Sequence, residues 1–178
     1  MKKTIFLTIV LSVLLSVMSV AVIAQPSNNI DKSKVDSLDN IISTLYSVIS
    51  GEKGEVRDWK LFKSLFHTDA KLIFTQKNKE GSFIAKYMTP DDYINGAGKW
   101  LVANGFFEKE IQKSVNTFGT ITQVFSTYES FKSAKDEIPF ARGINSIQLF
   151  NDGQRWWIIN IYWTSETKDN LIPSKYLP

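Results

Sequence analysis

Hydroxyl, phenol and amide side chains are the main candidates for chemistry in this 178-residue chain. A few such groups can orient a largely apolar small molecule by hydrogen bonds. Alternation of side chains along the strands predicted below places one polar set on a single sheet face: Ser126, Tyr128, Asn145, Asn160 and Tyr162, framed by Phe74 and Trp156. The sequence therefore predicts a ligand-binding pocket, and the alternative is that the two asparagines only hydrogen-bond each other across the strands.

The same set is poorly suited to acid–base catalysis. A phenol has an unperturbed pKa of about 10, and no partner base is evident beside Tyr128 or Tyr162. His67 is the only imidazole, and so the only side chain that ordinarily titrates near neutrality. It lies at a predicted helix-to-strand corner, where it could cap the corner or act as a general acid or base at the pocket mouth. These three residues are the catalytic candidates, and the sequence favours a protein that is not an enzyme.

Other kinds of chemistry lack the residues they need. The chain has no cysteine and one histidine, which excludes disulfides, thiolate nucleophiles and zinc–thiolate sites. No regularly spaced cluster of carboxylates provides a set of metal ligands. We therefore predict no metal and no cofactor.

The N-terminal segment 1–24 has the pattern of a signal peptide. Lys2 and Lys3 precede an apolar run, and Val22 and Ala24 supply small residues at the −3 and −1 positions of a cleavage site. We predict cleavage after Ala24, with a retained anchor as the alternative, and export to the periplasm or the medium. Cleavage would leave 19 of the 21 basic residues against 18 acidic ones, so no basic field for nucleic acid remains. We expect no membrane association after cleavage.

The mature part is predicted to be a flexible lead-in, residues 25–30, followed by one domain, residues 31–178. Apolar residues recur at helical spacing between Asp31 and Gly51, and a second helix is predicted from about Val56 to Phe66. Thr89 followed by Pro90 and two aspartates is a helix start, and this helix should run to about Ala103. The remaining pattern predicts strands at Lys71–Thr75, Phe83–Met88, Phe106–Phe118 and Thr120–Phe131, and a long hairpin at Gly143–Glu166.

The hairpin fixes the expected register. Asp152-Gly153 between two aromatic-rich runs is a strong hairpin signal, and it would pair Phe150 with Arg155 and Asn145 with Asn160. A symmetric connection to the preceding strand would place Glu129 opposite Arg142, as an expected ion pair. Four large residues would then share the outer face, where we predict a homodimer interface: Trp157, Ile159, Ile161 and Trp163.

Several segments carry a resemblance to a known group of proteins. Leu65–Phe74, Thr89–Ile94, Phe125–Ser130, Ala141–Leu149 and Asp152–Trp163 are similar to stretches of the nuclear-transport-factor-2-like, or SnoaL-like, superfamily, in its uncharacterised bacterial exported branch. The resemblance implies an α+β cone of three N-terminal helices packed on a strongly curved, mixed or antiparallel sheet. It also implies an inner pocket for a small lipophilic or aromatic molecule, and dimers formed through the outer sheet face.

The activity of this superfamily does not carry over residue by residue. Ketosteroid isomerase has an acid in its first strand, where this chain has the apolar Leu72, Ile73 and Phe74. Its second acid lies before the last hairpin turn, where this chain has Asn145 and Ser146. The resemblance therefore leaves two functions open: a binding protein, or a cyclase, dehydratase or isomerase acting on a small lipophilic or aromatic substrate.

Overall fold

The computed structural model describes residues 30–178; the predicted signal peptide and most of the predicted lead-in lie outside them. The elements in chain order are η1 (Lys32–Lys34), α1 (Leu38–Ile49), α2 (Trp59–Ser64), β1 (Phe66–Lys77), β2 (Phe83–Met88), α3 (Pro90–Tyr93), η2 (Ile94–Gly98), α4 (Lys99–Asn104), β3 (Phe107–Phe118), β4 (Ile121–Phe131), β5 (Ala141–Asn151), β6 (Trp156–Ser165) and η3 (Ser174–Tyr176). Within this part of the chain, no helix has the length and apolar character needed to cross a bilayer. The order of elements matches the prediction.

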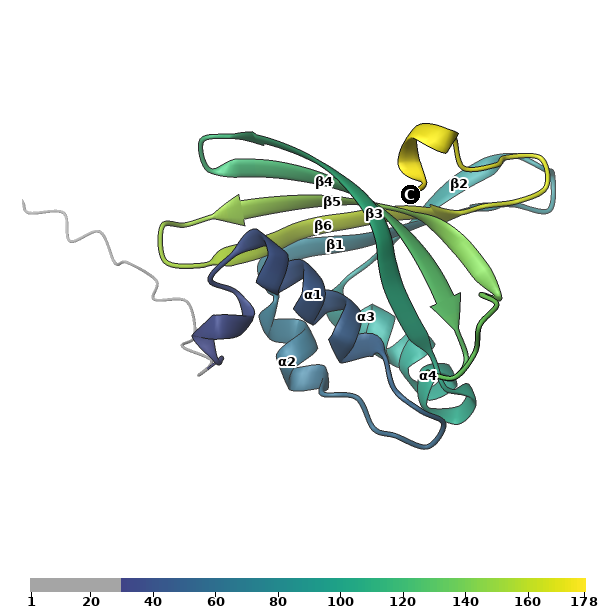
Figure 1. Ribbon diagram of the computed structural model, residues 1–178, viewed down its shortest axis with the longest axis horizontal. Coiled ribbons are helices and arrows are strands. Elements are labelled where there is room, and N and C mark those ends of the chain that lie inside the picture. Colours follow the sequence, from purple (N-terminus) through teal and green to yellow (C-terminus); the bar gives the residue numbers. More distant parts are fainter. Residues whose placement is uncertain (1–29) are drawn as a thin grey trace, which may run out of the picture.

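One curved sheet carries the fold. Its strand order is β2-β1-β6-β5-β4-β3, and every neighbouring pair is antiparallel except β1 and β6, which run parallel. The helices pack against one face of the sheet, while the C-terminal segment lies over the opposite face (Figure 1). This confirms the predicted α+β cone with a mixed sheet.

Helix α1 is shorter than predicted because the chain folds differently at both ends. Ser37 caps its start by accepting a hydrogen bond from the Asn40 amide at 3.1 Å, and the residues before it form the separate turn η1. At the other end, Gly51 pairs with Phe106 as an isolated bridge instead of forming a left-handed cap. The apolar stripe of α1 nevertheless packs against the sheet, with Ile41 and Leu45 almost fully buried.

The helix after β2 begins as the sequence predicts and then departs from ideal geometry. Thr89 and Asp92 form a capping box, with the Asp92 amide donating to Thr89 Oγ1 at 3.1 Å. The following stretch, η2, is π-helical, and α4 continues the path to Asn104. The predicted single helix is thus interrupted at its centre by a wider turn.

The predicted register of the β5–β6 hairpin is wrong. Asn151 pairs with Trp156, and an irregularity between Leu149 and Gln148 leaves Ile159 as an extra residue on β6. Asn145 consequently faces Trp163 instead of Asn160. Since a shift of one residue exchanges the two faces of a strand, everything after the bulge points to the side opposite the predicted one.

The β4–β5 register is confirmed, although the expected ion pair is not. Glu129 lies opposite Arg142 as predicted, but the Arg142 guanidinium pairs with Glu166 Oε2 at 2.8 Å. Neighbouring β3 also contains a bulge: Gln112 pairs with Thr127 and Glu110 with Tyr128, which leaves Ile111 as the extra residue. This second bulge turns Glu108 and Glu110 toward the helices.

Candidate functional site

A cavity of about 280 Å³ lies between the concave face of the sheet and the helices. Its wall is mostly apolar and aromatic, with contributions from Phe62, Leu72, Trp100, Phe106 and Ile161. Its polar residues come from five elements, α3 and the strands β3 to β6: Tyr93, Glu108, Tyr128, Ser130, Asn145 and Ser165. An apolar cavity with a few converging polar groups is the usual form of a small-molecule site.

Glu108 is the only acid among the residues that line this cavity. Burial raises the pKa of its carboxyl to about 7, although hydrogen bonds from Asn145 and Ser130 work in the opposite direction by favouring the ionised form. Asn145 Nδ2 donates to Glu108 Oε1 at 3.2 Å, and Ser130 Oγ donates to Oε2 at 3.4 Å. The carboxyl is therefore able to exchange a proton close to neutral pH.

A buried chain of hydrogen bonds fixes the amide that holds Glu108. Asn145 Nδ2 also donates to Tyr46 Oη at 3.1 Å, and Tyr46 Oη lies 2.7 Å from Ser126 Oγ. Ser126 Oγ donates to Glu110 Oε2 at 2.5 Å, so the phenol of Tyr46 must donate to Ser126. Every donor in this chain points the same way, which leaves the Asn145 amide one orientation.

The two phenols in the cavity wall act as hydrogen-bond donors and not as bases. Burial raises the pKa of Tyr128 to about 12, and it raises the pKa of Tyr93 as well. Nearby Glu108 raises both further, because a phenolate beside a carboxylate would be a second negative charge. The Tyr128 hydroxyl lies 3.4 Å from Ser165 Oγ. Glu108 thus remains the one group here that titrates near neutrality.

The structure brings only some of the predicted pocket residues to the cavity. Tyr128 and Asn145 line it, whereas Ser126 is buried behind its wall in the hydrogen-bond chain. Trp156 packs against the core, and the ring of Phe74 contacts that of Trp163 at 5.6 Å between centroids; neither lines the cavity.

Asn160 and Tyr162 were placed on the wrong face. Asn160 pairs with Gln148, and Tyr162 pairs with Ser146, both beyond the bulge at Ile159. Tyr162 is 46% exposed and lines a hollow beneath the C-terminal segment on the convex side. The predicted contact between Asn145 and Asn160 is therefore absent, because the bulge reverses the alternation of side chains.

The predicted dimer residues divide between the two faces for the same reason. Ile161 is 6% exposed and belongs to the core, and Trp163 packs against that core. Both placements on the outer face are therefore wrong. Trp157, with its indole N–H donating to Asp152 Oδ2 at 2.7 Å, and the 40% exposed Ile159 lie before the reversal, on the outer side.

His67 lies away from the cavity. It is the second residue of β1, and its ring meets the Trp157 ring edge-on at 6.1 Å between centroids. No lining residue of the cavity is a histidine. Among residues 30–178, no three His, Asp or Glu side chains gather closely enough to hold a metal ion.

Glu108 is the residue that sequence reasoning missed. It stands in Phe106-Phe107-Glu108-Lys109-Glu110, and a regular strand closed at Gly119 would place Lys109 opposite Ser130. The bulge at Ile111 shifts this pairing by one residue, so that Glu108 faces Ser130. The hydroxyls of Ser126 and Ser130 on one face were the only signal that an acid could be accommodated there.

Comparisons with known proteins define the fold. No protein-family model matches the chain, and no curated protein matches it. A protein of unknown function with a cystatin-like fold from Nostoc punctiforme is similar in structure, with a TM-score of 0.55, 10% identity, and coverage of 73% of this chain and 89% of that one. A nuclear-transport-factor-2-like protein of unknown function from Pseudomonas putida is also similar, with a TM-score of 0.54 and 10% identity. The match covers 76% of this chain and 89% of that one.

A candidate scytalone dehydratase from Novosphingobium aromaticivorans is similar to the same extent. Its TM-score is 0.54 at 10% identity, covering 72% of this chain and 81% of that protein. At such low identity, these similarities concern the backbone and not the chemistry of the site. The chain has the cystatin-like, nuclear-transport-factor-2-like fold that its sequence resembles.

Proposed function

We propose that this chain is an exported binding protein that holds a small, largely apolar molecule in the cone and hydrogen-bonds one polar group of that molecule to Glu108. The observation that carries the proposal is a single carboxyl, with a pKa raised to about 7, in a mostly apolar and aromatic cavity of about 280 Å³ that holds no other acid. A cavity of this size suits a molecule of one or two rings.

The polar groups indicate what the bound molecule must offer. Ionised Glu108 accepts a hydrogen bond, whereas the phenols of Tyr93 and Tyr128 remain protonated and can donate. A ligand carrying both a hydroxyl and a carbonyl or ether oxygen would satisfy both sides. An unpaired polar group in such a cavity costs about 1–3 kcal/mol, so a purely apolar ligand should bind less well.

One observation favours a second function, an enzyme using Glu108 as general acid or base. A carboxyl with a pKa of about 7 is matched to proton transfer at neutral pH, and strongly shifted acids in cavities are often catalytic. This is the alternative of a cyclase, dehydratase or isomerase. It assigns to Glu108 the acid–base role for which His67 was a candidate in the sequence analysis.

Binding of naphthol, a neutral two-ring phenol, tests the first function. We expect saturable binding in calorimetry, stronger by several-fold at about pH 8 than at about pH 5, because ionised Glu108 accepts a strong hydrogen bond from the phenol hydroxyl. The Glu108→Gln variant should lose this pH dependence. Ala141→Trp, which fills the cavity from its wall, should abolish binding. Unchanged binding to a folded Ala141→Trp variant would refute the proposal.

Nitrobenzisoxazole tests the catalytic alternative. A base removes its carbon-bound proton while the ring N–O bond breaks, giving a coloured cyanophenolate, so the reaction reports any reactive carboxylate in an apolar cavity. An enzyme-like base predicts turnover that rises through about pH 7 and disappears in Glu108→Gln. Naphthol binding without this turnover would favour the binding function.

We propose further that the protein forms a homodimer through its outer sheet face, with a smaller interface than the sequence predicted because Ile161 and Trp163 are not part of it. Ile159 and Tyr162 remain exposed there, while the C-terminal segment covers Phe125 through its ring contact with Tyr176 at 4.9 Å. Sedimentation of the protein and of an Ile159→Glu variant tests this: a dimer should dissociate in the variant. A monomeric wild-type protein at high concentration would exclude the dimer.

A further inference from the structure

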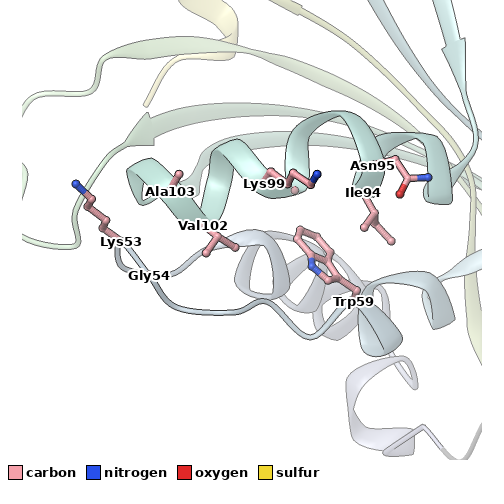
Figure 2. A pocket seen from close by; sticks show the side chains of 9 residues that line it. Lys53, Gly54, Trp59, Ile94, Asn95, Lys99, Val102 and Ala103 are labelled. Atoms are coloured by element: carbon pink, nitrogen blue, oxygen red, sulfur yellow. The ribbon is translucent and has the colours of Figure 1, made fainter.

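A second hollow lies on the outer side of the helical layer, away from the cone. It has a volume of about 690 Å³, and its two walls are the loop after α1 and the helical path from η2 to α4 (Figure 2). Nine residues line it: Lys53, Gly54, Trp59, Ile94, Asn95, Gly98, Lys99, Val102 and Ala103. We call this feature the outer groove, and its size is within the range of ligand pockets, about 300–1,000 Å³.

The loop wall of the outer groove is held rigidly against the helix wall. Arg57 is only 4% exposed, and its guanidinium donates to the carbonyl oxygens of Ile49 at 2.9 Å and Gly51 at 2.6 Å. The Gly54 amide donates across the groove floor to the Val102 carbonyl at 2.7 Å. A buried cation bonded to several carbonyls fixes a loop strongly, so the groove is preformed.

The helix wall has a sequence unfavourable for a regular α-helix where it lines the groove. Its segment η2 reads Ile-Asn-Gly-Ala-Gly, is π-helical, and includes two glycines that each destabilise a helix by about 1 kcal/mol relative to alanine. A Cβ at Gly98 would lie 3.1 Å from Trp59 Cζ2, so glycine lets the indole pack there. Such local departures from good helix sequence occur often at functional sites.

The charge of the outer groove is one-sided. Lys53 and Lys99 stand at its two walls, and none of the nine lining residues is acidic. No ion pair found within residues 30–178 involves either lysine. In contrast, Lys63 and Lys113, on the same side of the sheet, pair with carboxylates at 3.2 Å and 2.8 Å. The groove therefore combines an apolar lining with two lysines that take part in none of these ion pairs.

The outer groove and the cone are separate sites on opposite sides of one helical wall. Tyr93, Ala97 and Leu101 line the cone. The residues that follow each of them, Ile94, Gly98 and Val102, line the groove. The two sites share none of their lining residues, so each can be altered without touching the other.

We propose that the outer groove is a second binding site, for a small anionic molecule with a flat apolar body, such as an aromatic carboxylate or sulfonate. The ring system lies against Trp59, Ile94 and Val102, and the positive charges of Lys53 and Lys99, one at each wall, attract the anionic group. The Asn95 side chain supplies a further hydrogen-bond donor at the rim. The proposal does not depend on the function of the cone.

Two fluorescent probes of nearly the same shape test this site: anilinonaphthalene sulfonate, which is anionic, and phenylnaphthylamine, which is neutral. We expect the sulfonate to bind the purified protein with one-to-one stoichiometry and to bind more weakly in high salt. The double variant Lys53→Glu, Lys99→Glu should weaken sulfonate binding by about tenfold or more. Phenylnaphthylamine binding should change little in that variant, because the neutral probe carries no charge to recognise.

Matched variants separate this site from its alternatives. Ala103→Phe, which places a ring in the groove, should weaken both probes. The control Lys79→Glu, Lys168→Glu makes the same charge change at exposed positions elsewhere, and sulfonate binding should stay within about twofold of wild type. If both double charge variants weakened sulfonate binding equally, the net charge of the protein would explain the loss, and the proposal would be overturned. Loss of sulfonate binding in Ala141→Trp, with the groove variants unaffected, would place the probe in the cone and also overturn it.

Discussion

The two β-bulges of the sheet act on the cone in opposite ways. The extra residue Ile111 in β3 turns the acid Glu108 into the cavity. The extra residue Ile159 in β6 turns Ile161 and Trp163 into it and directs Tyr162 outward. One residue inserted in each strand therefore gives the cavity one polar wall and one apolar wall.

The energetic consequences of the two bulges are also opposite. Burying an ionisable carboxyl is unfavourable, and the raised pKa of Glu108 measures that cost. Burying an isoleucine side chain contributes about 2–3 kcal/mol of stability. Burial of the apolar wall can thus offset the cost of burying Glu108. Substitutions on the apolar wall should change overall stability, whereas substitutions on the polar wall should change how stability depends on pH.

The largest effect is expected from Ile161→Ala, on the apolar wall. Ile161 is 6% exposed and belongs to the core, so its truncation should lower the free energy of unfolding by about 3 kcal/mol. Ile159→Ala, at the bulge itself, removes the same atoms from a 40% exposed position and should cost less than about 1 kcal/mol. Urea unfolding measures both. Similar losses in the two variants would mean that β6 follows the regular alternation.

On the polar wall, Glu108→Gln should change how stability depends on pH. The native state holds the Glu108 proton with a pKa near 7, against 4.5 ordinarily, so the contribution of this one group to stability is greatest at low pH. This contribution is lost as pH rises from about 4.5 to about 7, by at most about 3 kcal/mol. The variant lacks this pH-dependent contribution. Its free energy of unfolding should therefore rise relative to that of the wild type as pH increases from about 4.5 to about 7. Glu137→Gln, on an exposed loop, should show no such gain.

The sequence could predict the elements of the fold but not the two bulges. Hydrophobic periodicity, the capping residues at Thr89 and the turn at Asp152-Gly153 were local signals, and they located the elements and the cone. The face that a side chain occupies far from a turn depends on every residue between, and no local signal identified Ile111 or Ile159 as unpaired. Tyr128 pairs with Gly143 and Asn145 with Ser126 in the regular β4–β5 ladder, and both side chains line the cavity as expected.

The outer groove lay further beyond sequence reasoning. Its loop wall depends on Arg57 reaching backbone carbonyls at residues 49–55 and Leu101. Carbonyl oxygens are present at every position, so no residue type reveals that they converge. Lys53 and Lys99 are 46 positions apart in the sequence, and only the fold brings them to one groove.

A smaller loss is expected from Asn145→Leu. Its amide donates to both Glu108 and Tyr46, and leucine leaves both acceptors without these bonds at a cost of about 2 kcal/mol. The pKa of Glu108 should rise further, because the Asn145 hydrogen bond favours the ionised form. Unfolding at several pH values measures both effects. Gln148→Leu, three residues along β5 and on the outer face, should lower stability by less than about 0.5 kcal/mol.

The smallest effect is expected from Tyr162→Phe, the phenol that the β6 bulge turns away. Its side chain is 46% exposed on the convex face, so loss of the hydroxyl should change stability by less than about 0.5 kcal/mol and leave naphthol affinity within about twofold. Tyr128→Phe removes the same atom from the cavity wall and should weaken naphthol by about fivefold. The pair forms a matched test of the two faces by calorimetry. If Tyr162→Phe weakened naphthol as much as Tyr128→Phe does, both phenols would share the cavity, and the bulge at Ile159 could not reverse the strand.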